Sequence, residues 1–449
     1  MQKRFRYVHE QRGCFDNRTD PVPGAAGEHR NWPSLDCRAG FYKAGFIEYN
    51  EDGSPVDPDQ EKKVLALIDY EKQRADGHKI ITVAYVHGWK NNASQVLPGR
   101  NPQDVERFET ALSELGYRAR TADNKPGIPV IGVYIGWRGK SVRGPGWFTW
   151  LSYWPRRNVA NHVGGPDVAT TLNRIIDQTN KDSNTSRVLL VGHSFGARVL
   201  EHAIETHKVK LYDSVRGQPA ASPRVDLVLY VNSANDSRLS LGRVQALKSD
   251  AIVARHPDYD PIKCAQAGND RVCRDYPLLV AISSRADWAT RGLLPVANSM
   301  YPDRGSAPPP VIPAGEFLDK TPAAPLYIRT AAAQMRFLHS HDVVEAPCPR
   351  RSAPACSSTS PNCVFAFSTV GEETVCYAVS KRQPEAGKKP FNDSAFWIMA
   401  VDKPVIPDHG GIWNLSFVDM LGELMAPRGF FEPGTGRVRL QAATSAPGS

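Results

Sequence analysis

Residues 187–205, RVLLVGHSFGARVLEHAIE, place a tight turn between an apolar run and an amphipathic segment. The run Val188–Val191 predicts a buried strand, and the residues after Gly196 predict a helix. Between them lies Gly192-His193-Ser194-Phe195-Gly196, a G-x-S-x-G pattern in which the serine occupies a sharp strand-to-helix turn. Glycine lacks a Cβ and therefore fits where the backbone folds this closely. The segment predicts a sheet with a helix packed against it and a serine held above the sheet edge.

Six apolar, β-branched runs predict buried strands. They are continuous rather than alternating in polarity, as expected for parallel strands covered on both faces. Amphipathic segments between several of these runs predict helices. We therefore predict an α/β fold with a mostly parallel central sheet flanked by helices and a large insertion before the last strand. The strand-like runs are 80–86, 129–135, 187–191, 225–231, 278–283 and 396–401.

Other segments predict one edge strand, one closing helix and three amphipathic helices. The edge strand is expected within 45–57, where it runs into a turn at Asp52-Gly53. The sequence LSFVDMLGEL near the C-terminus predicts a closing helix. The three apolar stripes are Val64, Leu67 and Ile68; Val105, Phe108, Leu112 and Leu115; and Val168, Leu172, Ile175 and Ile176.

More than a hundred residues separate the last two predicted strands, far more than a crossover needs, so we expect an extra subdomain there. Within it, residues 363–380 predict a β-hairpin. The predicted organisation is an N-terminal segment and edge strand (1–57), the first part of the core (58–299), an insertion or cap subdomain (300–394), the last part of the core (395–436) and a flexible tail (437–449).

Composition is typical of a large protein without a membrane span. The chain has 449 residues, 41% of them hydrophobic, and no run approaches the roughly 18 apolar residues of a spanning helix. The N-terminal residues MQKRFRYVHE lack an apolar stretch, so no signal peptide is visible. The net charge of +8 comes from scattered Lys and Arg, which favours a mixed surface over a nucleic-acid patch. We expect no nucleic-acid partner and make no prediction of the oligomeric state.

The eight cysteines all lie outside the predicted core strands. No spacing matches the C-x-x-C pattern of zinc or redox sites. Their even number and local clustering favour disulfides, and therefore an exported or periplasmic protein. Free thiols in a cytoplasmic protein are the alternative. The cysteines are Cys14, Cys37, Cys264, Cys273, Cys348, Cys356, Cys363 and Cys376.

A serine hydroxyl becomes a good nucleophile only beside a base that a buried acid orients. When the serine follows a strand in this pattern, the acid and then the histidine come later in the chain. His409 lies in a Pro- and Gly-bounded loop directly after the last apolar strand, and we predict that it is the general base. The competing pair, His339 and His341, precedes that strand, and we interpret it as structural or surface histidines rather than metal ligands. No metal is expected.

Three aspartates follow predicted strands and are candidates for the acid. Asp287 is favoured because it lies in the sharp turn SSRADWAT, where Trp288 could shield its carboxylate. Asp236 and Asp402 are the alternatives. Each could instead form an Asx turn or cap a helix, which is a common function of Asp at strand ends.

The loop after the first predicted core strand begins His87-Gly88-Trp89. At this position a loop can direct a backbone N–H toward a substrate oxygen, and we predict an oxyanion hole from the amides of Trp89 and Phe195. His87 is expected to fix this loop. We group His87, Gly88, His193 and Trp137 as the substrate-binding residues.

Residues 137–154, WRGKSVRGPGWFTWLSYW, hold four of the nine tryptophans. An aromatic segment after a strand of this sheet could form a lid, an acyl-binding wall or a lipid-interface contact. A core helix is the simpler alternative. Peripheral membrane contact is thus one of the partner hypotheses.

The segments VHGWKNNA, GHSFGA, SSRADWAT and PDHGGIW, in this order, resemble the α/β-hydrolase superfamily, and more narrowly bacterial lipase- or esterase-like serine hydrolases. The resemblance covers most of 45–425 apart from the insertions. It implies a Ser-His-Asp mechanism without a metal or organic cofactor, and it does not fix the substrate. Our own prediction is a hydrolase that acts through an acyl-enzyme on a small-molecule or lipid carboxylic ester. The alternatives are a thioesterase, a phospholipase, a peptidase or a non-catalytic binding protein on the same fold.

Overall fold

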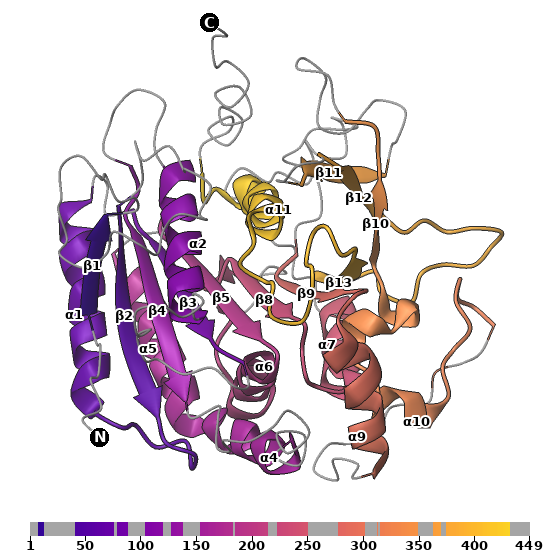
Figure 1. Ribbon diagram of the computed structural model, residues 1–449, viewed down its shortest axis with the longest axis horizontal. Coiled ribbons are helices and arrows are strands. Elements are labelled where there is room, and N and C mark those ends of the chain that lie inside the picture. The colour runs from indigo at the N-terminus through magenta and orange to yellow at the C-terminus, as the bar shows by residue number, and fades with distance from the viewer. Residues whose placement is uncertain are drawn as a thin grey trace, which may run out of the picture.

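An eight-stranded sheet forms the centre of the computed structural model (Figure 1). The structure describes residues 8–12, 41–75, 79–88, 104–119, 127–137, 153–182, 185–213, 222–249, 277–300, 312, 315–348, 362–369 and 374–431. The strand order is β1-β2-β4-β3-β5-β8-β9-β13, and every neighbouring pair except β1–β2 is parallel. The strands are β1 (Val8–Arg12), β2 (Phe41–Tyr49), β3 (Ile81–Val86), β4 (Val130–Trp137), β5 (Arg187–His193), β8 (Leu227–Val231), β9 (Leu279–Ser284) and β13 (Phe396–Val401).

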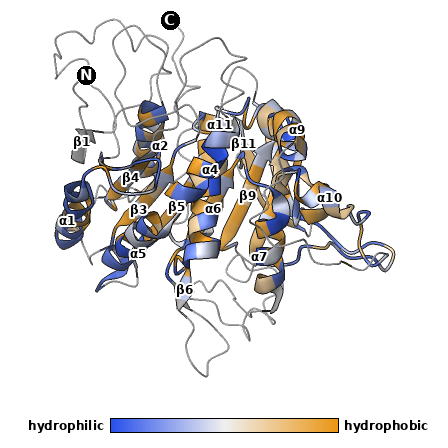
Figure 2. Cartoon of the chain, turned by 90° about the horizontal axis from the view of Figure 1, so that it is seen from below, coloured by the Kyte–Doolittle hydropathy of each residue, from blue (hydrophilic) through white to orange (hydrophobic). Residues whose placement is uncertain are grey.

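Helices cover both faces of this sheet, which confirms the predicted α/β class. Figure 2, viewed from below, shows the apolar strands β3, β5 and β9 between two layers. Apolar side chains of α1, α4, α5, α6 and α7 share one buried cluster, and those of α2 and α11 share the other. The helices are α1 (Pro58–Arg74), α2 (Asp104–Arg118), α4 (Tyr153–Val163), α5 (Pro166–Asn180), α6 (Phe195–His207), α7 (Ser237–Ser249) and α11 (Leu415–Met425).

The three predicted apolar stripes are buried, at the positions expected on α1, α2 and α5. Local sequence also sets where helices begin. Asp57 precedes Pro58, and its carboxylate accepts a 2.9 Å hydrogen bond from the Asp59 N–H at the start of α1. Asn414 does the same for α11 by accepting from the Phe417 N–H at 3.0 Å.

The strand predicted at the edge of the sheet is the second strand from the edge. β2 begins earlier than expected and lies between β1 and β4, so it is an inner strand. The prediction was wrong because β1 pairs antiparallel with β2 and takes the edge itself. Polar residues make β1, VHEQR, hard to recognise as a strand by apolar pattern.

Between β9 and β13 the chain forms a second, smaller sheet in the order β10-β12-β11. Its strands are β10 (His341–Glu345), β11 (Cys363–Ser368) and β12 (Cys376–Lys381), and the antiparallel pairing of β11 with β12 confirms the predicted hairpin. Phe365, Phe367, Tyr377 and Val379 share a buried cluster with β13 and α11. The inserted sheet therefore extends the core of the main sheet.

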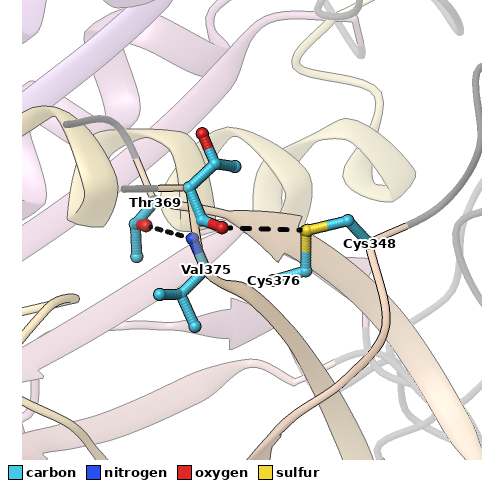
Figure 3. Close-up of a disulfide and its surroundings, with 5 residues drawn as sticks. Cys348, Thr369, Val375 and Cys376 are labelled. Carbon is cyan, nitrogen blue, oxygen red and sulfur yellow. Dashed lines mark hydrogen bonds between the residues drawn. A yellow bond between two sulfur atoms is a disulfide. The ribbon is translucent and has the colours of Figure 1, made fainter. Parts of the chain in front are cut away.

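A disulfide links Cys348, which follows β10, to Cys376 at the start of β12 (Figure 3). Cys363 is also disulfide-bonded. These bonds confirm the prediction of disulfides among the cysteines of the insertion. In the described part of the chain, no helix combines the length and apolar character needed to cross a bilayer.

The last two strands of the sheet bring distant parts of the chain together. β9 and β13 pair in parallel over their full lengths, from Leu279 with Phe396 to Ser284 with Val401. Residues that follow the two strands therefore emerge at the same edge of the sheet, where β5 also ends. This edge contains the residues predicted to do chemistry.

Candidate active site

Ser194 lies in the turn that joins β5 to α6. Its backbone has φ of 56°, a conformation that costs a non-glycine residue energy and is often found at functional positions. The turn is held by hydrogen bonds from the Ser194 N–H to the Val231 carbonyl at 3.0 Å and from the Ala234 N–H to the Ser194 carbonyl at 3.1 Å. Gly196 packs so closely that an added Cβ would overlap the Val86 carbonyl oxygen. This contact explains the second glycine of the pattern.

The structure brings Ser194, His409 and Asp287 together. His409 Nε2 is 2.7 Å from Ser194 Oγ, and His409 Nδ1 is 2.9 Å from Asp287 Oδ2. Because a carboxylate only accepts, Nδ1 carries the proton and Nε2 is left as the acceptor for the serine hydroxyl. The His409 side chain is 31% exposed, whereas Asp287 is fully buried. An imidazole facing solvent is thus oriented by a carboxylate that water does not reach.

Asp287 is surrounded by hydrogen-bond donors. Its Oδ1 accepts from the Ala289 and Thr290 N–H groups at 2.9 and 3.2 Å, and its Oδ2 accepts from Thr290 Oγ1 at 2.6 Å. Burial raises the pKa of Asp287, but the hydrogen bond and charge of His409, together with the Thr290 donors, outweigh burial and leave the pKa below its usual value. The carboxylate is therefore ionised at neutral pH.

The two alternative acids have other partners. Asp236 is buried and forms a two-bond ion pair with Arg238, at 2.8 and 2.9 Å. Asp402 pairs with Arg285 at 2.6 Å. Of the three aspartates considered from the sequence, Asp287 is the one placed against the His409 ring.

Two residues hold the backbone of His409, an arrangement that was not predicted from the sequence. The His409 carbonyl accepts from the Asn232 amide at 3.1 Å and from His193 Nε2–H at 2.7 Å. Asn232 also accepts from the Ser284 N–H at 2.9 Å, so one buried side chain connects the ends of β8 and β9 to the histidine loop. Asn232 has φ of 47°, and an asparagine directly after a buried strand is the sequence signal that could have identified it.

His193, directly before Ser194, and His87, in the loop that approaches Ser194, are both neutral. Burial lowers the pKa of His193 to about 3, with a further contribution from the charge of His409. Because His193 Nε2–H donates to the His409 carbonyl, its Nδ1 is unprotonated, and Nδ1 has no hydrogen-bond partner among the described residues. Burial likewise lowers the pKa of His87 to about 4.

His87 fixes the backbone around it, as expected. Its Nδ1–H donates to the Gly88 carbonyl at 2.8 Å, and its Nε2 accepts from the Trp137 N–H at 2.9 Å. The Trp137 indole in turn donates to the His87 carbonyl at 2.9 Å. Both side chains are buried, with their polar atoms used in this way. An added Cβ on Gly88 would lie 2.9 Å from Ser194 Cβ, so glycine permits this loop to approach the serine.

The structure describes only part of the predicted oxyanion hole and aromatic segment. Phe195 is buried at the first position of α6, directly after Ser194. Trp89 and residues 138–152 lie outside the described residues. Trp154, at the end of the aromatic segment, lies in α4, and its indole donates to the Ala297 carbonyl at 3.2 Å.

Trp288 corrects one expectation. Its side chain is 69% exposed, so it does not shield the Asp287 carboxylate, which other groups bury completely. The indole instead lies along its own helix, where Gly292 leaves space: a Cβ on Gly292 would be 3.1 Å from Trp288 Nε1.

His339 and His341 are buried rather than exposed. His339 Nε2 is 3.0 Å from the Ala333 carbonyl, and the His341 ring lies 3.9 Å from the Trp397 ring, centroid to centroid. Within the described ranges, no group of three or more His, Cys, Asp or Glu side chains is placed to hold a metal ion. The two histidines have packing partners, in keeping with a structural function.

No protein-family model matches the sequence, and no curated protein does. Similar solved structures include phospholipase PlaB from Legionella pneumophila in complex with thio-NAD, with 12% identity, coverage of 68% of this chain and 50% of that chain, and a TM-score of 0.21. A second PlaB structure has 12% identity, coverages of 68% and 51% and a TM-score of 0.20. An uncharacterized protein from Pseudomonas aeruginosa has 11% identity, coverages of 54% and 42% and a TM-score of 0.21. The chain spans about half the length of the PlaB chains it matches.

Proposed function

We propose that this protein is a serine hydrolase of the α/β-hydrolase type that cleaves carboxylic esters. The observation that carries the proposal is the position of His409, 2.7 Å from Ser194 Oγ through one ring nitrogen and 2.9 Å from Asp287 through the other. This geometry is what a base needs to activate a serine hydroxyl. The fold supports it, because the three residues follow different strands of one mostly parallel sheet.

In the proposed reaction, Ser194 Oγ attacks the ester carbonyl while its proton moves to His409 Nε2. The ionised Asp287 stabilises the imidazolium that forms and keeps the proton on Nδ1. The amides of Phe195 and Trp89 are the proposed donors to the oxyanion. His409 then protonates the leaving alcohol, and a water molecule deprotonated by His409 releases the acid from the acyl-enzyme.

The substrate we propose is a small-molecule or lipid ester, and the compartment an oxidising one. The disulfide between Cys348 and Cys376 supports an exported protein, because such bonds persist outside the reducing cytoplasm. We further propose that the segment between β9 and β13 acts as a cap subdomain with the boundaries 300–394.

Labelling with a fluorophosphonate probe tests the proposal directly. We expect the wild-type protein to be labelled and Ser194→Ala to remain unlabelled. Ser233→Ala is the matched control, since Ser233 lies in the loop after β8 and its hydroxyl accepts from the Asn235 N–H. If the folded wild-type protein is not labelled, or if Ser194→Ala is labelled equally, the proposal is wrong.

Substrate comparison separates the ester hydrolase from its alternatives. Parallel rates on matched ester, thioester and amide substrates of the same acyl group should favour the ester. A faster thioester or amide reaction would keep the serine chemistry and replace the proposed substrate class.

A further inference from the structure

The helix that follows Asp287 exposes an apolar stripe. Six large hydrophobic side chains are exposed in the described part of the chain. Three of them belong to this helix or cap its start: Trp288, Val296 and Met300, with exposed fractions of 69%, 46% and 55%. The helix consists of a π-helical turn, η3 (Ala289–Leu293), followed directly by α9 (Leu294–Met300). Its opposite side, including Leu294 and Ala297, is buried in the core.

The π-helical turn aligns the stripe. A π turn contains more residues than an α turn. Two residues eight positions apart therefore point to nearly the same side of the helix when a π turn lies between them, but not when the helix is purely α. Trp288 and Val296 are eight positions apart, and Met300 follows one α turn later. The Trp288 indole also lies against Gly292, which comes between Trp288 and Val296 along the helix. Trp288, Val296 and Met300 therefore lie on one side of the helix, and we call this set of exposed apolar side chains the α9 stripe.

The charge beside this stripe is positive. Arg291 is the one charged residue in the sequence from Trp288 to Met300, and its side chain is exposed. Arg285, just before the helix, is ion-paired with Asp402 and adds no net charge there. The neighbouring helix α10 (Ala324–Tyr327), next to α9 in Figures 1 and 2, adds Leu326, which is 46% exposed. Exposed Arg329 follows this helix.

We propose that the α9 stripe is a docking surface for a lipid bilayer containing anionic headgroups. A tryptophan beside aliphatic side chains and arginines is the combination that suits an interface, since the apolar groups enter the acyl boundary while the cations contact phosphate. A folded protein partner would not require the flanking cations. The reason for its location rests on the proposed function: the helix starts beside Asp287, so docking would bring the lipid surface close to Ser194.

Vesicle flotation tests the proposal with the full chain carrying Ser194→Ala, so that no lipid is consumed. We expect binding to phosphatidylcholine vesicles that contain phosphatidylglycerol, and weaker binding as salt rises. Replacing Val296 and Met300 together by serine should reduce the partition coefficient at least about tenfold. Arg291→Gln should reduce it about fivefold on anionic vesicles and leave binding to pure phosphatidylcholine unchanged.

The matched control is the double variant Tyr70→Ser and Val344→Ser, which removes exposed hydrophobic side chains elsewhere, 52% and 50% exposed. It should bind vesicles as the parent does, and melting temperatures should show that all variants are folded. Equal binding by the α9-stripe variant and the parent overturns the proposal, as does an absence of vesicle binding. A concentration-dependent dimer that the stripe variant loses would assign the surface to a second copy instead.

Activity separates this proposal from the enzymatic one. With Ser194 restored, the variant with Val296 and Met300 replaced by serine should hydrolyse a soluble short-chain ester at the wild-type rate. Vesicle binding without any ester hydrolysis would reject the proposed function and leave the docking surface standing. Hydrolysis without vesicle binding would do the reverse.

Discussion

Asp287 and Glu201 are both buried acidic side chains, and their pKa values shift in opposite directions. Asp287 lies in the turn after β9, where two backbone N–H groups at the start of a helix and a Thr290 hydroxyl donate to it, and His409 adds a fourth hydrogen bond. Glu201 lies on α6, where Asn235 and Ser240 each donate one hydrogen bond at 2.7 Å. Burial raises the pKa of Glu201 to about 7, and its acidic neighbours Glu205 and Asp236 add to the rise.

The comparison shows that burial alone does not decide the charge of a carboxyl group. Both groups lose water, which favours the neutral form. At Asp287, helix-start N–H groups and a base that becomes positive replace the lost hydration. At Glu201, two neutral donors do not compensate. The region proposed for chemistry therefore keeps a permanent anion, whereas the interior of α6 holds a group that changes protonation near neutral pH.

The largest expected effect is on kcat, and it follows from removing the negative charge of Asp287. Asp287→Asn should lower kcat for ester hydrolysis by about 10⁴, because an amide in this position no longer favours the productive His409 tautomer. Asp236→Asn is the matched control and should retain kcat, since Asp236 pairs with Arg238. Steady-state kinetics on a nitrophenyl ester measure both. The reverse result would move the acid to Asp236.

An effect of intermediate size is expected on the free energy of unfolding, through the protonation of Glu201. In the pH range between the ordinary glutamate pKa near 4.5 and about 7, folded Glu201 holds more proton than the unfolded chain, so stability falls as pH rises through this range. The loss is on the order of 3 kcal/mol by pH 8. Glu201→Gln mimics the neutral form, since its amide can donate to Ser240 Oγ and accept from Asn235.

Denaturant unfolding at pH 5 and pH 8 measures this loss. The Glu201→Gln variant should unfold like the wild type at pH 5 and be more stable than it at pH 8, with kcat unchanged. If the two proteins respond identically to pH, Glu201 does not titrate in this range.

The smallest effect concerns one donor to Asp287. Thr290→Val removes the 2.6 Å hydroxyl contact and should lower kcat about tenfold with little change in KM, because the carboxylate is less well held. Thr290→Ser keeps the hydroxyl and should restore most of the rate. A loss of rate in Thr290→Ser with none in Thr290→Val would show that packing of the threonine methyl matters instead of the hydrogen bond, because valine keeps the methyl and serine keeps the hydroxyl.

Much of the fold and the meeting of the three site residues could be predicted, because both depend on local pattern and strand order. Six continuous apolar runs indicated a parallel sheet, and residues that follow its strands emerge at one edge. Ser194, Asp287 and His409 could thus be placed together without coordinates, although their catalytic roles stay a prediction.

What could not be predicted depends on contacts between distant segments. Asn232 could have been noted as an asparagine directly after a buried strand, but its contacts with Ser284 and the His409 loop join segments far apart in the chain, so the local pattern does not contain them. Trp288 was expected to cover Asp287, but a π-helical turn and Gly292 place it on the outer surface. The antiparallel edge strand β1 was missed because its residues are mostly polar.

The pairing of β9 with β13 has a consequence for how the length of this chain can change in evolution. Because the two strands are parallel, the excursion between them leaves at the end of β9 and rejoins the sheet at the opposite end of the adjacent β13, so its two ends are held about one strand length apart whatever its length. The entropic cost of closing a loop grows only with the logarithm of its length, so the whole excursion costs about 1.5 kcal/mol more than a 20-residue connection. Insertions or deletions here can therefore reshape what surrounds the serine while Asp287 and His409 stay in place. This part of the chain is where we expect related sequences to diverge most in length.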